Sequence, residues 1–349
     1  MRKTVNRWTM LLVLAFGASC HSMAIPAGEE LPQSIFDLLQ QEEVTKVRMA
    51  LDLEQLTQSK YDTSEYAGLI SFTDAEKNQQ EWKVDFTQRG KFRRSKCTDI
   101  PPLRLNFRKK DLKKAGLAKH DDMKLVTYCM GEEAEAREFL LREYLIYRLY
   151  NQLTDASYRV QLLDITFIDI NTQESRRQMG FLIEDTAQLR ARLSAQKANS
   201  KFAIKAEDFH SEHRQMASLF QYMIGNADWN LQQSKNVKHV IKDEKIIPVP
   251  YDFDFAAMVR ASYARLNSHL GQRSIDERFY LGFEQSSQEL AQTRKHFRKN
   301  KKQLVQTIKS FKLLDGKTRR EMIAYLQSFF AEEAEQMQFG GRNQPSVTK

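Results

Sequence analysis

Two short stretches of the chain concentrate side chains that carry oxygen atoms. The first holds Asp228 and Asn236 and the second holds Asp252 and Asp254, and a strand-like run separates the two stretches. Acidic side chains this close together repel one another unless water, a proton or a cation lies between them. The two stretches therefore predict a site that has a bound partner, and a metal ion held by oxygen ligands is one such partner.

The same residue types also serve structural roles. Asp and Asn readily form turns and helix caps, so a turn or cap is the alternative interpretation of Asp228. His210 and His213 are spaced as metal ligands can be, but no third histidine or cysteine lies near them in the sequence, which favours surface histidines. No Gly-x-Ser-x-Gly motif is present, which argues against a familiar hydrolase.

Alternating apolar and polar residues predict that the front of the chain is a sheet. Strand patterns cover residues 47–53, 67–72, 82–86, 103–107 and 123–128. A helical pattern at 132–153, a strand pair at 160–169 and 178–183, and a helix at 211–224 follow. The last of these helices leads directly to Asp228, and beyond Phe255 the pattern is mostly helical to about Gln338. Strands first and helices later indicate an α+β protein.

The N-terminus predicts export. Residues 1–7 are basic, and the apolar run 8–18 is too short to span a bilayer, as in a secretory signal that is cleaved after Ala24. A lipoprotein anchor on Cys20 is the less favoured alternative, because Gly17 stands where such a signal has leucine. The expected location is the periplasm or the cell envelope.

Two cysteines remain after removal of such a signal, Cys97 and Cys129. In an oxidising compartment an even number of cysteines predicts a disulfide. Two buried free thiols are the alternative, because spacing in the sequence does not establish that two Cα atoms are close enough to bridge.

The positive charge of the chain is local. Of a net +9, residues 294–320 contribute eleven lysine and arginine side chains against Asp315 alone. Leu290, Phe297, Leu304 and Phe311 recur every seven residues through this region, which predicts an amphipathic helix with a basic outer face. Without interleaved aromatic residues no nucleic acid is expected, and contact with an anionic surface or a phosphorylated partner stays open.

The order of several residues resembles the protein-kinase-like superfamily, in particular its CotH-type spore-coat kinases and HipA-type kinases. The resemblance rests on a lysine in mid-strand (Lys124), a glutamate in the following helix (Glu143), and a strand that ends at Glu184 and Asp185. Residues 88–94 and 101–107 look like the arginine-glycine segment and the following strand of CotH-type proteins, and residues 224–228 look like their catalytic loop.

The resemblance implies a two-lobed kinase-like fold that binds Mg-ATP between an N-terminal sheet-rich lobe and a C-terminal helical lobe. The expected parts are a signal peptide (1–24), the sheet-rich lobe (25–185), the helical lobe (186–338) and a flexible tail (339–349).

On the nucleotide side, the resemblance implies that Lys124 contacts the phosphates while Glu143 holds its ammonium group. Arg89, Arg93 or Arg94 would cover further phosphate charge, because no glycine-rich phosphate loop is present. Glu184 is a further expected cofactor-binding residue. The alternative is that Lys124 is an edge-strand lysine and Glu143 a charge on a helix surface.

On the transfer side, the resemblance implies that Asp228 takes or orients the proton of an acceptor hydroxyl. Asn236 and Asp254 would bind the metal ion, with Asp252 as the ligand if the register shifts. Asn236 lies eight positions after Asp228, whereas in kinase-like loops the corresponding spacing is about five positions.

The function expected from the resemblance is an exported, ATP-dependent transfer of a phosphoryl or nucleotidyl group to a protein or small-molecule acceptor. The rival is a non-catalytic, pseudokinase-like binding module of the cell envelope. The long gap and the missing glycine-rich loop suit either function.

Overall fold

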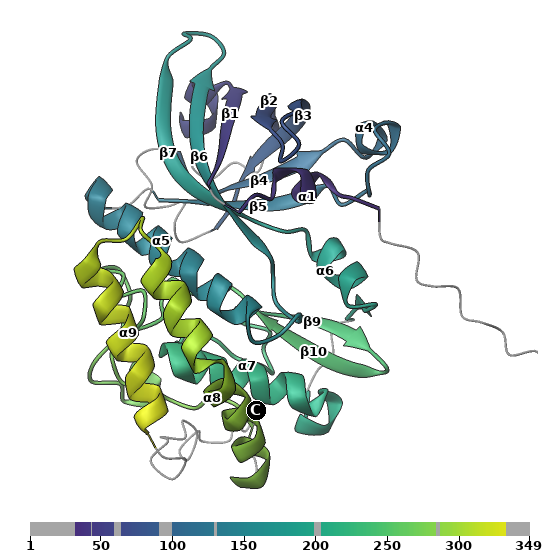
Figure 1. Ribbon diagram of the computed structural model, residues 1–349. Helices are drawn as coiled ribbons and strands as arrows, with labels where there is room; N and C mark the ends of the chain where they lie inside the picture. Colours follow the sequence, from purple (N-terminus) through teal and green to yellow (C-terminus); the bar gives the residue numbers. More distant parts are fainter. Residues whose placement is uncertain are drawn as a thin grey trace, which may run out of the picture. The chain divides into compact units, whose positions relative to one another are not determined.

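The computed structural model describes residues 32–42, 44–58, 64–90, 100–128, 131–198, 204–283 and 287–332, with only the backbone of 287–289. All of the described residues belong to one unit of the chain (Figure 1). Cys97, Cys129, the signal segment and the C-terminal tail lie outside the described residues. The disulfide, the export signal, the flexible tail and any role of Arg93 or Arg94, which also lie outside the described residues, therefore stay predictions. The division of the chain at residue 185 also stays a prediction.

Seven strands close into a barrel in the order β1-β2-β3-β4-β5-β7-β6. They are β1 (Thr45–Leu51), β2 (Tyr66–Thr73), β3 (Gln79–Gln88), β4 (Leu103–Phe107), β5 (Asp122–Thr127), β6 (Val160–Asp169) and β7 (Ser175–Ile183). Neighbours are antiparallel except β1 and β6, which pair in parallel from Thr45 opposite Leu163 to Leu51 opposite Asp169. This pairing leaves the barrel without a free edge.

Alternation along each strand turns one apolar face into the barrel. The core there includes Met49, Ile70, Phe86, Leu105 and Phe167, all fully buried. Three short helices accompany the barrel strands: α1 (Ile35–Leu39), α2 (Leu53–Gln58) and α4 (Lys109–Lys114).

The two-lobed kinase-like fold predicted from the sequence is wrong. A sheet-rich lobe beside a helical lobe was expected, whereas the strands form a closed seven-stranded barrel of mixed direction. The physical reason is the parallel pairing of β1 with β6, which satisfies the backbone groups of both outer strands. Local periodicity carries no information about this pairing, because it joins segments far apart in the chain.

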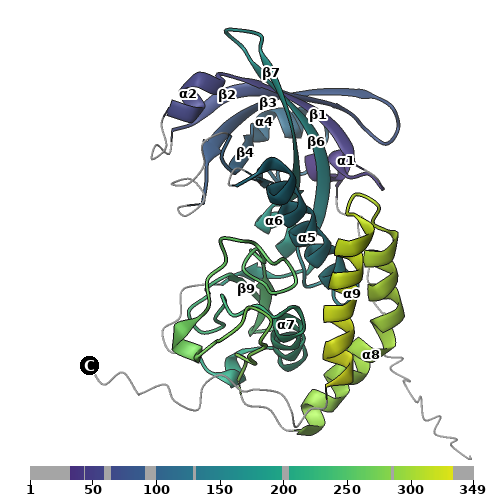
Figure 2. The same cartoon turned by 90° about the vertical axis from the view of Figure 1, so that its left-hand side faces the viewer.

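Four longer helices surround a second apolar core. They are α5 (Glu133–Asn151), α7 (Ser211–Ile224), α8 (Ser287–Ser310) and α9 (Gly316–Ala331). The outward-facing Val126, Leu162 and Phe181 of the barrel join this core. Figure 2 shows α5 directly beneath the barrel and α8 alongside α9. No helix within the described residues is both long and apolar enough to cross a membrane.

A second, three-stranded sheet lies in the part of the chain that follows the barrel, in the order β10-β9-β8. Its strands are β8 (Gln196–Lys197), β9 (Val237–Lys242) and β10 (Lys245–Pro250), and the nearby short elements are α6 (Thr186–Arg192), η1 (Ala206–Asp208) and η2 (Ser268–Leu270). Between Phe255 and α8, the described residues contain only η2 as helix, so the helical pattern predicted from Phe255 begins at Ser287.

The β9–β10 hairpin explains why the two acidic stretches meet. Asp243 and Glu244 form its turn with positive φ angles of 48° and 61°, as tight hairpin turns require. The register pairs Val237 with Pro250. The residues just outside the hairpin, Asn236 before β9 and Tyr251 after β10, therefore lie at the same end, and the Tyr251 N–H donates to the Asn236 carbonyl at 3.0 Å.

Candidate functional site

Lys124 lies on the outer side of the barrel, close to the rings of two tyrosines. Its strand neighbours Met123 and Leu125 are fully buried in the barrel core, so alternation directs Lys124 outward. Its Nζ is 4.6 Å from the ring centre of Tyr251 and 5.5 Å from that of Tyr158. Aromatic faces attract cations at such distances.

The surroundings of Lys124 disfavour its charged form. Burial, and next the nearby Arg89, lower the pKa of its ammonium group to about 8, while Asp122 and Asp252 act in the opposite direction. Among the described residues, Lys124 makes no ion pair. Arg89 follows β3, and its backbone N–H donates to the Pro102 carbonyl at 2.9 Å. An anion at this place would relieve both desolvation and repulsion.

Glycine is required where α7 ends. Gly225 has a φ angle of +67°, and a Cβ there would lie 2.1 Å from the Tyr325 hydroxyl oxygen and 2.7 Å from the Ala257 Cβ. The next residue, Asn226, is buried, and its Oδ1 accepts from the Asp228 N–H at 2.9 Å. This turn uses the Asn226 side chain, so the Asp228 carboxylate is left to make other contacts.

The Asp228 carboxylate contacts two side chains. Lys235 Nζ lies 2.5 Å from Oδ1, and Asn236 Nδ2 donates to Oδ2 at 2.9 Å and to the main-chain oxygen at 2.7 Å. The eight-residue gap is spanned by a turn in which Asn230 and Lys235 exchange backbone hydrogen bonds. That turn returns Asn236 to Asp228.

Asp252 links the second acidic stretch to α5 and to Lys124. Its backbone has a positive φ angle of 64°, and its N–H donates to the Tyr147 hydroxyl at 2.9 Å. Its charge acts on Lys124 and also helps to raise the pKa of Tyr147, after burial and Glu143. The structure therefore brings Lys124 and Asp252 into one electrostatic cluster.

Asp254 lies deeper in the same segment and is 6% exposed. The segment is tied to the end of α7, because Ala257 N–H donates to the Gly225 carbonyl at 3.0 Å and Met258 N–H to the Ile224 carbonyl at 3.1 Å. Backbone hydrogen bonds thus hold the segment with Asp252 and Asp254 beside the loop of Asp228.

The residues present fit a magnesium ion in part. Because the Asn236 amide nitrogen donates to Asp228, its amide oxygen is the atom that remains to bind a cation. Asp252 and Asp254 add carboxylate oxygens. No group of three or more His, Cys, Asp or Glu in the described part of the chain could hold a metal ion. Magnesium sites with one or two carboxylates draw their other ligands from water and substrate phosphates.

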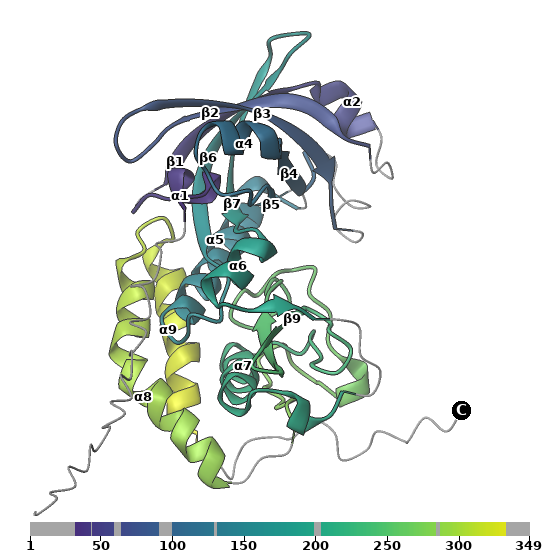
Figure 3. The same ribbon diagram turned by 90° about the vertical axis from the view of Figure 1, so that its right-hand side faces the viewer.

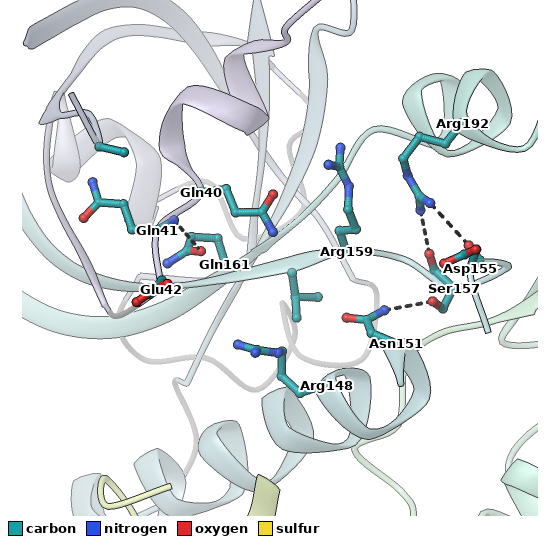
Figure 4. A pocket seen from close by; sticks show the side chains of 12 residues that line it. Gln40, Gln41, Glu42, Arg148, Asn151, Asp155, Ser157, Arg159, Gln161 and Arg192 are labelled. Carbon is teal, nitrogen blue, oxygen red and sulfur yellow. Dashed lines mark hydrogen bonds between the residues drawn. The ribbon is translucent and has the colours of Figure 1, made fainter. Parts of the chain in front are cut away.

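In the described structure neither Glu143 nor Glu184 forms an ion pair with Lys124. Glu143 is 2% exposed on α5, which is not a surface position. Both oxygens of Glu184 are engaged by arginines: Arg159 Nε lies 3.0 Å from Oε2 and Arg192 Nη2 lies 2.6 Å from Oε1. These two arginines line a cavity of about 620 Å³ (Figure 4). Glu184 therefore orders that cavity's wall.

Several site residues were not identified from the sequence. Tyr251 and Tyr158, which flank Lys124, have no sequence signal of their own. Lys235 could have been noted from its position beside Asn236. A cavity of about 280 Å³ adjoins Asp228, and Asn267 anchors its wall by donating to the Ala227 carbonyl at 3.0 Å.

Comparison with known proteins yields no relative from which a role could be transferred: no protein-family model matches the chain, and no curated protein matches it. The site has to be interpreted from its own chemistry.

Proposed function

We propose that the protein binds a magnesium nucleotide beside Lys124 and Asp252 and transfers a phosphoryl or nucleotidyl group from it to an acceptor. The observation that carries the proposal is the electrostatic cluster around the half-buried Lys124, whose ammonium group feels the charges of both Arg89 and Asp252. Lys124 and Arg89 offer positive charge, and Lys124 makes no ion pair among the described residues. Asp252 acts on Lys124 and follows Tyr251, whose backbone N–H donates to the Asn236 carbonyl. The proposal rests on these residues and not on a kinase-like fold.

Phosphoryl transfer requires charge neutralisation and alignment more than covalent help. Lys124 and Arg89 would bind phosphate oxygens, and Asp252, Asp254 and Asn236 would hold the metal ion. When bound, the magnesium ion would neutralise the phosphate charge.

Asp228 would act on the acceptor. In the transfer step a bond forms between the acceptor oxygen and phosphorus, the bond from phosphorus to the leaving phosphate oxygen breaks, and the hydroxyl proton passes to the Asp228 carboxylate. The 280 Å³ cavity gives an acceptor access to this carboxylate, because Asp228 lines its wall. The acceptor is a protein segment or a small molecule with a hydroxyl group.

A second candidate is a non-catalytic binding module of the cell envelope that holds the same ligand without turnover. The specific observation in its favour is that both oxygens of Asp228 already have partners, Lys235 and Asn236. These contacts fix the orientation of the carboxylate, as a purely structural role in a binding module would require. Under either function we propose export to the periplasm or the cell envelope, which the N-terminal sequence supports.

Calorimetric titration with ATP, with and without magnesium, tests the site. We expect magnesium-dependent binding that Asp254→Ala abolishes. Asp276→Ala is the control, because Asp276 is a half-exposed carboxylate that is paired with Arg260 and belongs to neither acidic stretch. Equal binding by the Asp254 variant and the unmodified protein would refute the site, and binding without consumption of ATP would favour the binding module.

A further inference from the structure

The outer side of α8 is a continuous basic surface. From Leu290 to Ser310 the helix contains seven lysine and arginine residues and no acidic residue. Lys295, Lys299, Lys302 and Lys309 are exposed, and in the described part of the chain none of them makes an ion pair. We call these four residues the α8 basic face.

The geometry of the helix separates this face from the core. With 100° of rotation per residue, the four lysines fall within an arc of about 80°. Leu290, Phe297, Leu304 and Ile308 fall on the opposite side and are buried. Figure 3 shows α8 and α9 side by side, with α7 between them and β9. The basic face therefore points away from the core that α8 helps to build.

The four charges lie along one line. Lys295 and Lys309 are fourteen residues apart, which at 1.5 Å of rise per residue is about 21 Å. Like charges on one helix face repel one another. Because the core side of α8 already supplies its packing, the repeated lysines are not needed to hold the helix in place.

We propose that the α8 basic face binds the surface of an anionic phospholipid membrane. A straight row of ammonium groups matches a flat layer of negative headgroups, and each lysine near such a surface adds to the attraction. Bases would need aromatic side chains on which to stack, and among the exposed residues of α8 there is no Phe, Tyr or Trp. The proposal is independent of the nucleotide site.

Sedimentation with vesicles tests the proposal on the full-length chain. The probe is phosphatidylcholine vesicles with and without phosphatidylglycerol, at low and high salt. One variant changes Lys295, Lys299, Lys302 and Lys309 to Gln. The matched control changes four exposed lysines of α4 to Gln and so removes the same charge: Lys109, Lys110, Lys113 and Lys114. Both variants keep the N-terminal segment, so any binding through it is equal in the two.

We expect salt-sensitive binding to the anionic vesicles alone, with affinity reduced about 100-fold or more in the α8 variant and little in the α4 variant. Circular dichroism would show that both variants are folded. Equal losses in the two variants, no binding to anionic vesicles, or tighter binding to duplex DNA than to vesicles would each overturn the proposal.

Discussion

Asn236 donates hydrogen bonds to Asp228 across a gap of eight residues, at 2.7 Å to the main-chain oxygen and 2.9 Å to the carboxylate. The turn between them therefore brings the two side chains into contact. Asn236 also has a φ angle of +52°, a conformation that Asn tolerates and most other residues do not.

Replacement of Asn236 should separate these two contributions. Asn236→Gly keeps the backbone conformation and loses the side-chain contacts, which we expect to cost about 1–2 kcal/mol of unfolding free energy. Asn236→Ala adds backbone strain and should cost more. Both should weaken magnesium-dependent ATP binding at least tenfold, as measured by calorimetry. An unchanged affinity in the Gly variant would exclude Asn236 as a ligand.

Lys124→Met should stabilise the protein at pH 7. The pKa of Lys124 is about 8 in the folded chain against 10.5 for an ordinary lysine, so the unfolded state binds more protons between these values and stability rises with pH there. Below pH 8 the charged Lys124 therefore lowers the free energy of unfolding by about 3 kcal/mol compared with its value above pH 10.5.

Urea unfolding at pH 7 and pH 10 measures this effect. The rise in stability between the two pH values should be smaller in Lys124→Met than in the unmodified protein. Lys110→Met, at an exposed position on α4, serves as the control and should keep the full rise. A rise of the same size in both variants would mean that Lys124 is not its source.

Nucleotide affinity should fall as pH increases above about 8, because Lys124 then loses the proton that attracts phosphate. Lys124→Arg keeps its charge throughout this range and should flatten the dependence. Titrations with ATP from pH 6.5 to 9.5 compare the two proteins. A pH profile that is the same for both would assign the titration to another group.

Asp228→Asn distinguishes the two proposed functions. The amide cannot accept the acceptor proton, so any ATP-dependent transfer should fall by about a hundredfold or more, while binding of Mg-ATP should change little. If ATP turnover is measurable and survives the substitution, Asp228 is not the base.

Gly225→Ala should destabilise the chain by about 1–3 kcal/mol through backbone strain alone, and by more because its Cβ would meet Tyr325 and Ala257. Gly271→Ala is the matched control, since Gly271 has nearly the same φ angle, +66°, with nothing within 4 Å of its Cβ position. Thermal unfolding of both variants isolates the steric contribution. Equal losses of stability in the two variants would mean that Tyr325 and Ala257 move aside without measurable cost.

Several elements of the fold were predictable because their signals are local. The strand patterns at 67–72, 82–86 and 103–107 fall on β2, β3 and β4, and the helix predicted at 211–224 is α7. The closure of the barrel was not predictable, because no local pattern relates β1 to β6. The surroundings of Lys124 depend in the same way on Tyr158 and Tyr251, which only the folded chain brings to it.

Barrel closure also sets the order in which the chain can fold. β1 pairs on one edge with β2, the next strand in the chain, and on its other edge with the distant β6, where Thr45 lies opposite Leu163. Such long-range pairing requires a large loop of chain to close. The entropy cost of closing this loop comes before the stabilising contacts form, which slows folding. During synthesis, β1 therefore keeps one exposed edge until more than a hundred further residues have been made, and this interval is when the chain is most open to pairing with a second copy of itself.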